Sequence, residues 1–394
     1  MSGLVVICND LDYFLRHRAE VPLKIKKNGH QVTIVTGGRF AQVSDQPDLD
    51  FEHTPIERFS FNPFLDAALT VRSLKIFLRT KPEAVHLITL KPAIYAGIAA
   101  LISRALGRGP KRVLITIPGL GRLMSPSSSM SGFMANFARK LIGLALRFIS
   151  SQKDVHFTFE TQHDFSVFVE KKLVSQTNAS VIKGAGVNPA LFYPKEKTEP
   201  TGALRILFAS RLLKSKGLEA FLMAAQKNVH GSSIQYVVAG MIEADDPDGY
   251  SAEELARNPA ITFLGEQNDM PSLLRTVDVV CLPTLYGEGI PRILIEAAAC
   301  GIASIATDVP GCNEIVLDGE TGVLIKPGAL SEMADDIASA TDVYAKNPSI
   351  LAAHSKAALS HFRAGGFSES SVIEHFVELL GFSGKSLKVS PKEE

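Results

Sequence analysis

Short apolar runs that alternate with longer amphipathic stretches limit the possible folds of this sequence more than any other feature. Residues 4–8 form the first apolar run, which leads through a loop into a helical stretch that ends at Gly29. Further strands are expected at residues 31–36, 85–88, 113–117, 155–159, 205–210, 235–239, 261–264, 277–282 and 303–306. Strands that alternate with helices build parallel sheets with helices on both faces, so the pattern predicts a doubly wound α/β fold.

The length of the chain favours two domains, because 394 residues are many for a single hydrophobic core. The first domain is expected at residues 1–190. Residues 191–203, rich in proline, lysine and glutamate, are expected to link it to a second domain at residues 204–366. A last helix is expected at residues 367–382, and the polar, lysine-rich residues 383–394 are predicted to be a disordered tail.

Composition and short motifs argue against several classes of protein. The four cysteines have no zinc-site spacing, no signal peptide precedes Leu4, and no apolar run approaches the roughly 18 residues of a membrane span, so a cytoplasmic protein is expected. The first strand and helix lack G-x-G-x-x-G, which gives no support to a nicotinamide cofactor. The form D-x-D occurs at residues 10–12, 48–50 and 246–248 in unrelated contexts, so chance explains it and no metal site is expected.

Charge is distributed unevenly although the net charge is zero. Residues 1–195 carry 25 Lys and Arg against 14 Asp and Glu, whereas residues 196–394 carry 16 against 27. The first half is therefore expected to meet an anionic partner. An anionic membrane surface or a diphosphate lipid fits better than nucleic acid, because no nucleic-acid-binding motif is recognised.

Two glutamates flank a predicted helix start in the second half. Residues 277–282 read as a buried strand, Glu288 lies in the loop that follows, and Glu296 lies in the helix that opens near Pro291. Ligands of doubly wound sheets bind at this edge, and a helix start suits phosphate oxygens. Carboxylates can bind sugar hydroxyls, so the pair suits a sugar nucleotide. The spacing alone is also compatible with two solvated glutamates.

Two motifs carry a resemblance to a known family. Residues 286–297 (YGEGIPRILIEA), with Pro310, Gly311 and Glu314 after them, resemble the E-x7-E region of the retaining glycosyltransferases of family 4. Residues 210–217 (SRLLKSKG) resemble the diphosphate loop G-R-L-x-x-x-K-G of the same family. The resemblance covers nearly the whole chain and implies the GT-B fold, two Rossmann-like domains that face each other across a cleft. It also implies that the last helix packs back toward the first domain.

The resemblance also implies roles for individual residues on the donor side. Glu288 would orient the transferred sugar, Glu296 would hold the ribose, and the second-domain cations would hold the diphosphate. The expected catalytic residues are thus Glu288, Arg211 and Lys216, and the expected nucleotide-binding residues are Glu296, Leu264, Gly265, Gly289, Ile290 and Pro291. The co-substrate would be a nucleoside-diphosphate sugar, expected to be UDP-linked, with no metal.

Acceptor residues are expected in the first domain. Lys91 follows the strand at residues 85–88 and is a candidate for an anionic acceptor group, and Gly119 and Gly121 let a ligand approach the backbone closely. Arg16 and Arg18 either face the acceptor diphosphate or are solvated helix charges. The helix at residues 133–149, with Arg139, Lys140 and Arg147 beside apolar residues, either docks on a membrane or packs in the core.

The subgroup resembled builds bacterial surface polysaccharides on polyprenyl diphosphate carriers. The sequence therefore predicts a retaining, metal-independent transferase that moves a hexose-type sugar onto a lipid-diphosphate-linked saccharide, peripherally at the inner face of the plasma membrane. Two alternatives remain open. One is a sugar-nucleotide epimerase of the same fold, and the other is a non-catalytic assembly partner.

Overall fold

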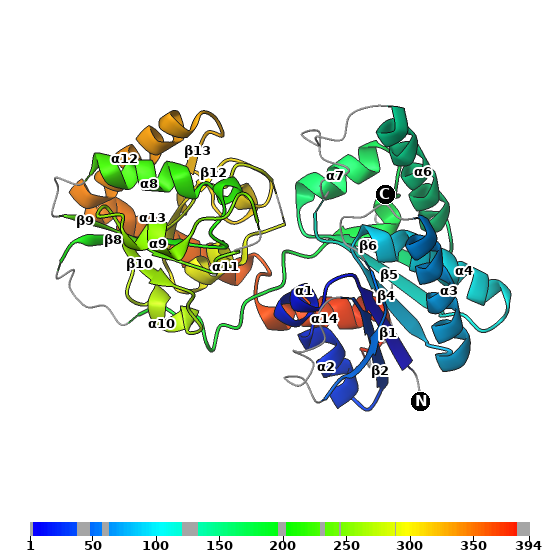
Figure 1. Ribbon diagram of the computed structural model, residues 1–394. Coiled ribbons are helices and arrows are strands. Elements are labelled where there is room, and N and C mark those ends of the chain that lie inside the picture. The colour runs from blue at the N-terminus through cyan, green and yellow to red at the C-terminus, as the bar shows by residue number, and fades with distance from the viewer. Residues whose placement is uncertain are drawn as a thin grey trace. The chain divides into compact units, whose positions relative to one another are not determined.

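The computed structural model describes residues 3–37, 48–56, 63–119, 133–195, 202–228, 233–243, 246–287 and 289–383 (Figure 1). The chain divides into two compact units, and each is described by itself. Unit 1 comprises Met1–Ala185 and Ser371–Glu394, and unit 2 comprises Gly186–Ser370.

A seven-stranded parallel sheet forms the centre of unit 1, with the strand order β3-β2-β1-β4-β5-β6-β7. The chain builds outward from β1 in one direction and from β4 in the other, so the strand order reverses between these two strands. The strands are β1 (Gly3–Cys8), β2 (Gln31–Thr36), β3 (Asp50–His53), β4 (Ala84–Ile88), β5 (Arg112–Ile117), β6 (Val155–Phe159) and β7 (Ala179–Val181).

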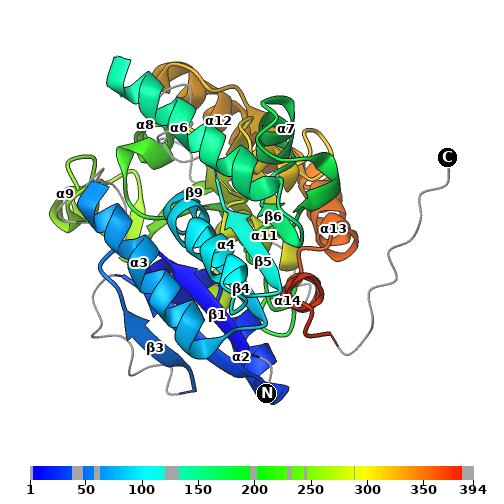
Figure 2. The same cartoon turned by 90° about the vertical axis from the view of Figure 1, so that its right-hand side faces the viewer.

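Helices cover both faces of this sheet, because alternate side chains of each strand point to opposite faces. Val5 and Ile7 of β1 join one apolar cluster, and Leu4 and Val6 join the other. Figure 2 shows the helices of the first face, α3, α4 and α6, in front of the sheet. The helices of unit 1 are α1 (Leu11–His17), α2 (Glu20–Lys27), α3 (Pro63–Thr80), the π-helical turn η2 (Pro92–Ala96), α4 (Gly97–Ala105), α6 (Phe133–Ser150), α7 (Gln162–Glu170), the 3-10 turn η3 (Gln176–Asn178) and α14 (Glu369–Leu380).

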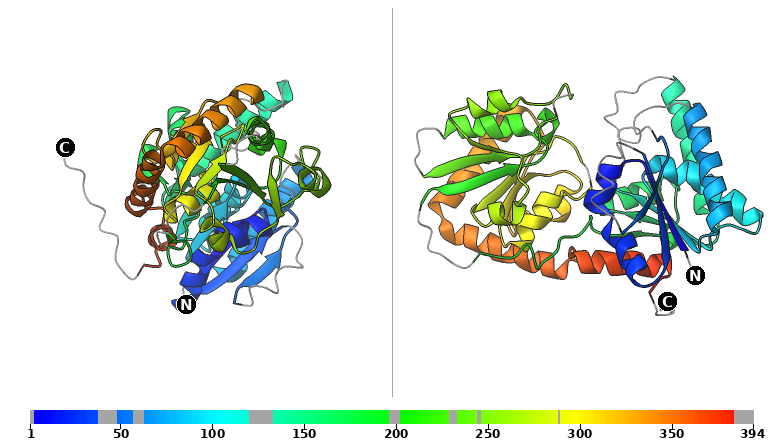
Figure 3. Two further views of the ribbon diagram at one scale, coloured as in Figure 1. Left: turned by 90° about the vertical axis from the view of Figure 1, so that its left-hand side faces the viewer. Right: turned by 60° about the horizontal axis from the view of Figure 1, so that its bottom comes forward.

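The last helix, α14, contributes to the core of unit 1. Val372, Phe376 and Leu380 are almost fully buried and belong to the apolar cluster that contains Leu4 and Val6 of β1. The right-hand view of Figure 3 shows α14 beside α2. The chain therefore returns from unit 2 to complete the core of unit 1.

Unit 2 contains a six-stranded parallel sheet with the order β10-β9-β8-β11-β12-β13, so its strand order reverses between β8 and β11. Its strands are β8 (Leu204–Ala209), β9 (Ile234–Ala239), β10 (Thr262–Gly265), β11 (Val279–Leu282), β12 (Ala303–Thr307) and β13 (Gly322–Ile325). Its helices are the 3-10 turn η4 (Lys214–Lys216), α8 (Leu218–Lys227), α9 (Ala252–Ala256), α10 (Met270–Leu274), α11 (Arg292–Ala299), the 3-10 turn η5 (Cys312–Glu314), α12 (Leu330–Lys346) and α13 (Pro348–Ala364).

The fold prediction is confirmed, since both units are doubly wound α/β structures. The division of the chain, however, falls after Ala185 rather than at residue 190. Val187 explains the difference, because it is fully buried in the core of unit 2 and exchanges backbone hydrogen bonds with Phe367 and Glu369. Phe192, expected in the linker, is also buried in this core, and residues 196–201 lie outside the described residues.

In the described part of the chain, no helix is both long enough and apolar enough to span a membrane.

Candidate functional site

Two loops of unit 2 meet where its strand order reverses. One follows β8 and contains residues 210–217, and the other follows β11 and contains residues 283–291. The Leu285 N–H donates to the Ser215 carbonyl at 3.1 Å. The carboxyl edge of a parallel sheet at such a reversal is where doubly wound folds bind ligands. Both predicted motifs therefore lie at the position where this fold places a binding site.

Gly217 allows the two loops to approach closely. Its φ of 78° lies in the left-handed region, and a Cβ atom there would lie 1.8 Å from the Pro283 carbonyl oxygen. No other residue type fits both constraints. The backbone contact in turn fixes the 3-10 turn η4, which carries Lys216.

Lys216 is largely buried at this point, with 6% of its surface exposed. Its Nζ atom lies 5.0 Å from the centre of the Tyr286 ring, so the ammonium group is held over an aromatic face. Tyr286 belongs to the quoted motif, but sequence reasoning gave it no role. Neither the spacing nor the residue type of Tyr286 indicated this contact with Lys216.

Arg211, the other predicted diphosphate ligand, is exposed. Its guanidinium forms an ion pair with Glu243 at 3.3 Å, and 45% of the side chain is accessible. Exposed ion pairs contribute little to stability, so a phosphate group can compete with Glu243 for this cation at small cost.

Glu296 lies on α11 and is 7% exposed. Arg292 Nε donates to Glu296 Oε1 at 2.8 Å, one helical turn earlier. Burial raises the pKa of the Glu296 carboxyl above its ordinary value, and the charge and hydrogen bond of Arg292 act in the opposite direction. Glu288, the other predicted carboxylate, lies outside the described residues.

The remaining predicted nucleotide-binding residues border the same edge. Gly265 ends β10 with a φ of 67°, and its carbonyl accepts from the Gly240 N–H at 2.9 Å. Among the described residues other than its chain neighbours, no heavy atom lies within 4 Å of the position that its Cβ would take, so the backbone is open to them there. Leu264 and Gly289 are half-buried, whereas Ile290 and Pro291 are buried at the start of α11.

In unit 1, Lys91 follows β4 at the reversal of strand order but is already paired. Its Nζ lies 2.9 Å from Asp66 Oδ1 of α3, and both side chains are at least four-fifths buried. Tyr95 also hydrogen-bonds Asp66, and burial followed by the Asp66 charge raises the pKa of Tyr95 to about 12. Of the two predicted acceptor glycines, Gly119 lies just after β5, and Gly121 is outside the described residues.

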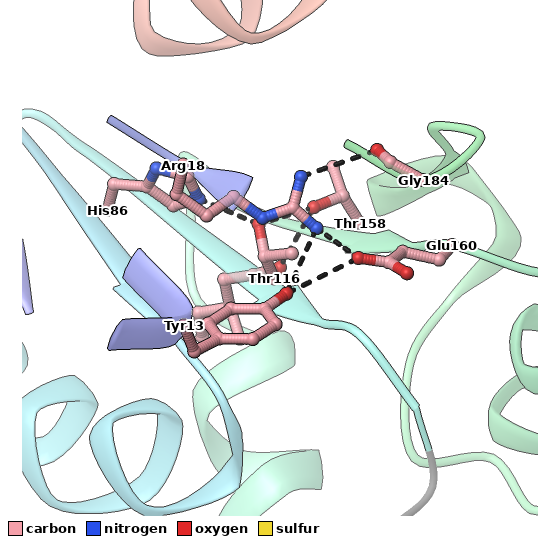
Figure 4. Close-up of polar contacts among 8 residues, drawn as sticks. Tyr13, Arg18, His86, Thr116, Thr158, Glu160 and Gly184 are labelled. Atoms are coloured by element: carbon pink, nitrogen blue, oxygen red, sulfur yellow. Dashed lines mark hydrogen bonds and ion pairs between the residues drawn. The ribbon is translucent and has the colours of Figure 1, made fainter. Parts of the chain in front are cut away.

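The placement of Arg18 corrects both interpretations given to it. Only 1% of its side chain is exposed, and its guanidinium donates to the Glu160 carboxylate, to the Tyr13 hydroxyl at 3.3 Å and to the Gly184 carbonyl at 3.3 Å (Figure 4). The side chain is neither solvated nor available to an acceptor diphosphate, because buried charges need a partner and Glu160 provides it. Arg16, by contrast, is exposed.

A separate chain of neutral polar groups lies beside the ion pair. His86 Nε2 lies 2.7 Å from the Thr116 hydroxyl, which lies 2.8 Å from the Thr158 hydroxyl (Figure 4). Burial, followed by the nearby charge of Arg18, lowers the pKa of His86 to about 3. His86 is therefore neutral near pH 7, and the charges of this region are those of Arg18 and Glu160. No role for Glu160 was expected from the sequence. The one indication of a role was its position at the carboxyl end of a predicted strand.

Among the described residues, no cluster of three or more His, Cys, Asp or Glu side chains could hold a metal ion.

Comparison with known proteins assigns a family to both halves of the chain. Residues 9–153 match the family described as "Glycosyl transferase 4-like", and residues 191–349 match "Glycosyl transferases group 1". Residues 9–153 lie entirely in unit 1, and residues 191–349 lie entirely in unit 2.

Similar proteins include a Campylobacter jejuni enzyme named N,N'-diacetylbacillosaminyl-diphospho-undecaprenol alpha-1,3-N-acetylgalactosaminyltransferase. It is 26% identical over 221 residues, which are 52% of this chain and 56% of that protein, so the match spans little more than half of its length. Among solved structures, a Rickettsia africae glycosyltransferase has a TM-score of 0.72 at 19% identity and covers 97% of this chain and 99% of its own. Anabaena HepE in complex with UDP has a TM-score of 0.69 at 17% identity and covers 96% and 99%.

The fold of both units and both family matches indicate a glycosyltransferase. The loops at the two reversals of strand order lie where such folds bind ligands. The chain has the GT-B fold and contains a glycosyltransferase 4-like domain followed by a group 1 glycosyltransferase domain.

Proposed function

We propose that this glycosyltransferase moves a hexose-type sugar, with retention of configuration, from a nucleoside-diphosphate sugar to a saccharide linked to a lipid diphosphate. The observation that carries the donor half of the proposal is the burial of Lys216 at the reversal of the unit 2 sheet. A buried ammonium group at a ligand-binding edge suits a diphosphate, whose charge it neutralises. HepE, which shares the fold, was solved with UDP.

The chemical step requires stabilisation of the departing diphosphate. As the bond between the anomeric carbon and the phosphate oxygen breaks, negative charge grows on the diphosphate, so Lys216 and Arg211 stabilise the transition state more than the bound donor. We propose that the acceptor hydroxyl attacks the anomeric carbon from the leaving-group side and that the departing diphosphate takes its proton. The family resemblance supports retention, and the proposal includes no metal.

Glu296 suits the ribose of the donor. Arg292 donates to its Oε1 atom, and the charge of Arg292 opposes the rise in pKa that burial causes. Carboxyl oxygens accept hydrogen bonds from sugar hydroxyls. Glu288 is proposed to orient the transferred sugar, on the basis of its place in the motif.

A lipid-diphosphate-linked acceptor is supported by the C. jejuni relative, whose name specifies an undecaprenyl-diphosphate-linked sugar. The sequence between Glu83 and Asp154 contains no acidic residue and ten Lys or Arg residues. Such a stretch favours attraction to anionic lipid headgroups and to the acceptor diphosphate. We propose peripheral membrane association of unit 1 on this basis.

Helix α6 provides an apolar surface for that association. Leu141, Leu144 and Phe148 expose 51%, 60% and 60% of their surfaces, and they lie at spacings of three and four residues, so they share one face of the helix. Lys140 and Arg147 are exposed beside this apolar face. Exposed apolar side chains flanked by cations are typical of helices that lie in a membrane interface.

Replacement of both Leu144 and Phe148 by Asp is expected to abolish co-sedimentation with vesicles that contain 30% phosphatidylglycerol, because each change removes apolar contact and adds repulsion. Val343→Asp on α12, an apolar residue of unit 2 that is 41% exposed, serves as the control and is expected to leave binding unchanged. Equal sedimentation of the double variant and the wild type would contradict the membrane assignment of α6.

The function as a whole is tested by incubating the purified chain with UDP-glucose, UDP-galactose and their N-acetylated forms, with and without a farnesyl-diphosphate-linked N-acetylglucosamine acceptor. Transfer is expected only with the acceptor present, and it should survive EDTA. Conversion of the donor in the absence of acceptor would support the epimerase alternative. Binding of the donor without turnover under either condition would support a non-catalytic assembly partner.

A further inference from the structure

Thr89, at the carboxyl end of β4, has an unusual backbone conformation. Its φ is 77°, in the left-handed region that glycine favours. The other non-glycine residues described with positive φ are Lys81, Asp154 and Lys172, none of which is β-branched. A β-branched side chain is disfavoured in this region because it crowds the backbone. Its neighbours hold the conformation, since its N–H donates to the Thr116 carbonyl at 2.9 Å and its carbonyl accepts from the Ala93 N–H at 3.0 Å.

Two further features mark the same corner of unit 1. The Thr89 hydroxyl oxygen is enclosed and has no hydrogen-bond partner among the described residues. A π-helical turn, Pro92–Ala96, follows directly before α4. Unpartnered buried hydroxyls and π-helical turns are both uncommon, and backbone strain and π-turns concentrate at functional sites. All three features lie where the strand order of the sheet reverses, between β1 and β4.

The charge of this corner indicates which ligand it suits. Asp66 pairs with Lys91, and both side chains are largely buried, so the two charges cancel. An ion pair whose charges cancel attracts a diphosphate weakly. It still offers hydrogen-bond donors and acceptors to neutral hydroxyl groups. This differs from the expectation that Lys91 binds an anionic acceptor group.

We propose that Thr89, Lys91 and Asp66 form a subsite for sugar hydroxyls of the acceptor, and that the Thr89 hydroxyl donates a hydrogen bond to that sugar. The inference rests on the proposed function for the identity of the acceptor. Rotation about χ1 from one staggered position to the next moves the hydroxyl of a threonine to the place that the methyl group or the hydrogen atom held. The bound sugar favours the rotamer that presents the hydroxyl, and the strained backbone fixes the place from which it is presented.

The test uses the full chain and two synthetic lipids, farnesyl diphosphate and farnesyl diphosphate that carries N-acetylglucosamine, with dissociation constants measured by calorimetry. Thr89→Val keeps the β-branched shape and removes the hydroxyl. We expect it to weaken binding of the sugar-bearing lipid by roughly tenfold and to leave the sugar-free lipid unchanged. Thr89→Ser keeps the hydroxyl and is expected to stay close to the wild type.

A stability measurement separates function from packing. Thr89→Gly relieves the strain and is expected to raise the melting temperature by roughly 2–4 °C while it weakens binding of the sugar-bearing lipid as Thr89→Val does. Lys172→Gly relieves strain elsewhere in unit 1 and is expected to leave binding unchanged.

Equal binding of the sugar-bearing lipid by Thr89→Val and the wild type would overturn the subsite, as would an equal loss for both lipids. A wild-type chain that binds neither lipid but binds UDP-sugars would refute the proposed acceptor class, and the subsite with it. The inference and the proposed function therefore fail in distinguishable ways.

Discussion

Replacing Lys216 by Ala is expected to lower kcat/KM for transfer by roughly 10²- to 10³-fold, the range observed when one preorganised donor to a developing anion is removed. The ammonium group is buried and held 5.0 Å above the Tyr286 ring, so it is already oriented before the donor binds. A preorganised cation stabilises the departing diphosphate without the cost of rearrangement. Initial rates with saturating acceptor and varied donor measure the effect.

Lys214 provides the matched control for this substitution. It occupies the same 3-10 turn as Lys216 but is exposed to solvent. Lys214→Ala is therefore expected to change kcat/KM less than about threefold, because exposed charges interact weakly through water. A Lys216→Ala variant that transfers sugar as fast as Lys214→Ala would show that the buried lysine does not hold the diphosphate.

The architecture of both units follows from the sequence because the strands are buried on both faces. Val279–Leu282 is an uninterrupted apolar run, and its neighbour Ala303–Thr307 is nearly so. Buried parallel strands need such runs, and the helices between them supply the covering layers. The positions of the buried strands could therefore be predicted closely, as could the presence of the two motifs at the carboxyl edge of unit 2. The edge strand β3, which is polar and partly exposed, was not among the expected strands.

The surroundings of individual charged residues could not be predicted in the same way. Arg18 looks like any basic residue in an amphipathic helix, but its partner Glu160 is 142 residues away. Lys91 pairs with Asp66, which lies on a different helix. Such pairings depend on which elements become neighbours in three dimensions, and neither residue spacing nor composition carries that information. The same limit applies to the end of the first unit, which the backbone pairing of Val187 with residues 367 and 369 determines.

Among substitutions that break one of the described ion pairs, removal of the Glu160 carboxylate is expected to lower the free energy of unfolding most. The Arg18 side chain is 1% exposed and that of Glu160 is 11% exposed. Glu160→Ala leaves a guanidinium buried without a carboxylate, which typically costs about 3–5 kcal/mol. Because the chain contains no tryptophan, urea unfolding is best followed by circular dichroism, with hydrogen exchange of β1 and β6 amides to localise the effect in unit 1.

Two comparisons decide whether the unpaired charge is the cause. Asp50→Ala removes the partner of Lys26 in an ion pair that is 37% and 77% exposed, and it is expected to cost less than about 1 kcal/mol. Arg18→Met combined with Glu160→Leu removes both charges and is expected to recover most of the stability lost by Glu160→Ala, because apolar pairs of similar volume often replace buried ion pairs without loss. The guanidinium also contacts the Phe376 ring of α14 at 5.4 Å and the carbonyl of Gly184. If the double variant is no more stable than Glu160→Ala, these contacts, rather than charge compensation, are the main contribution of Arg18.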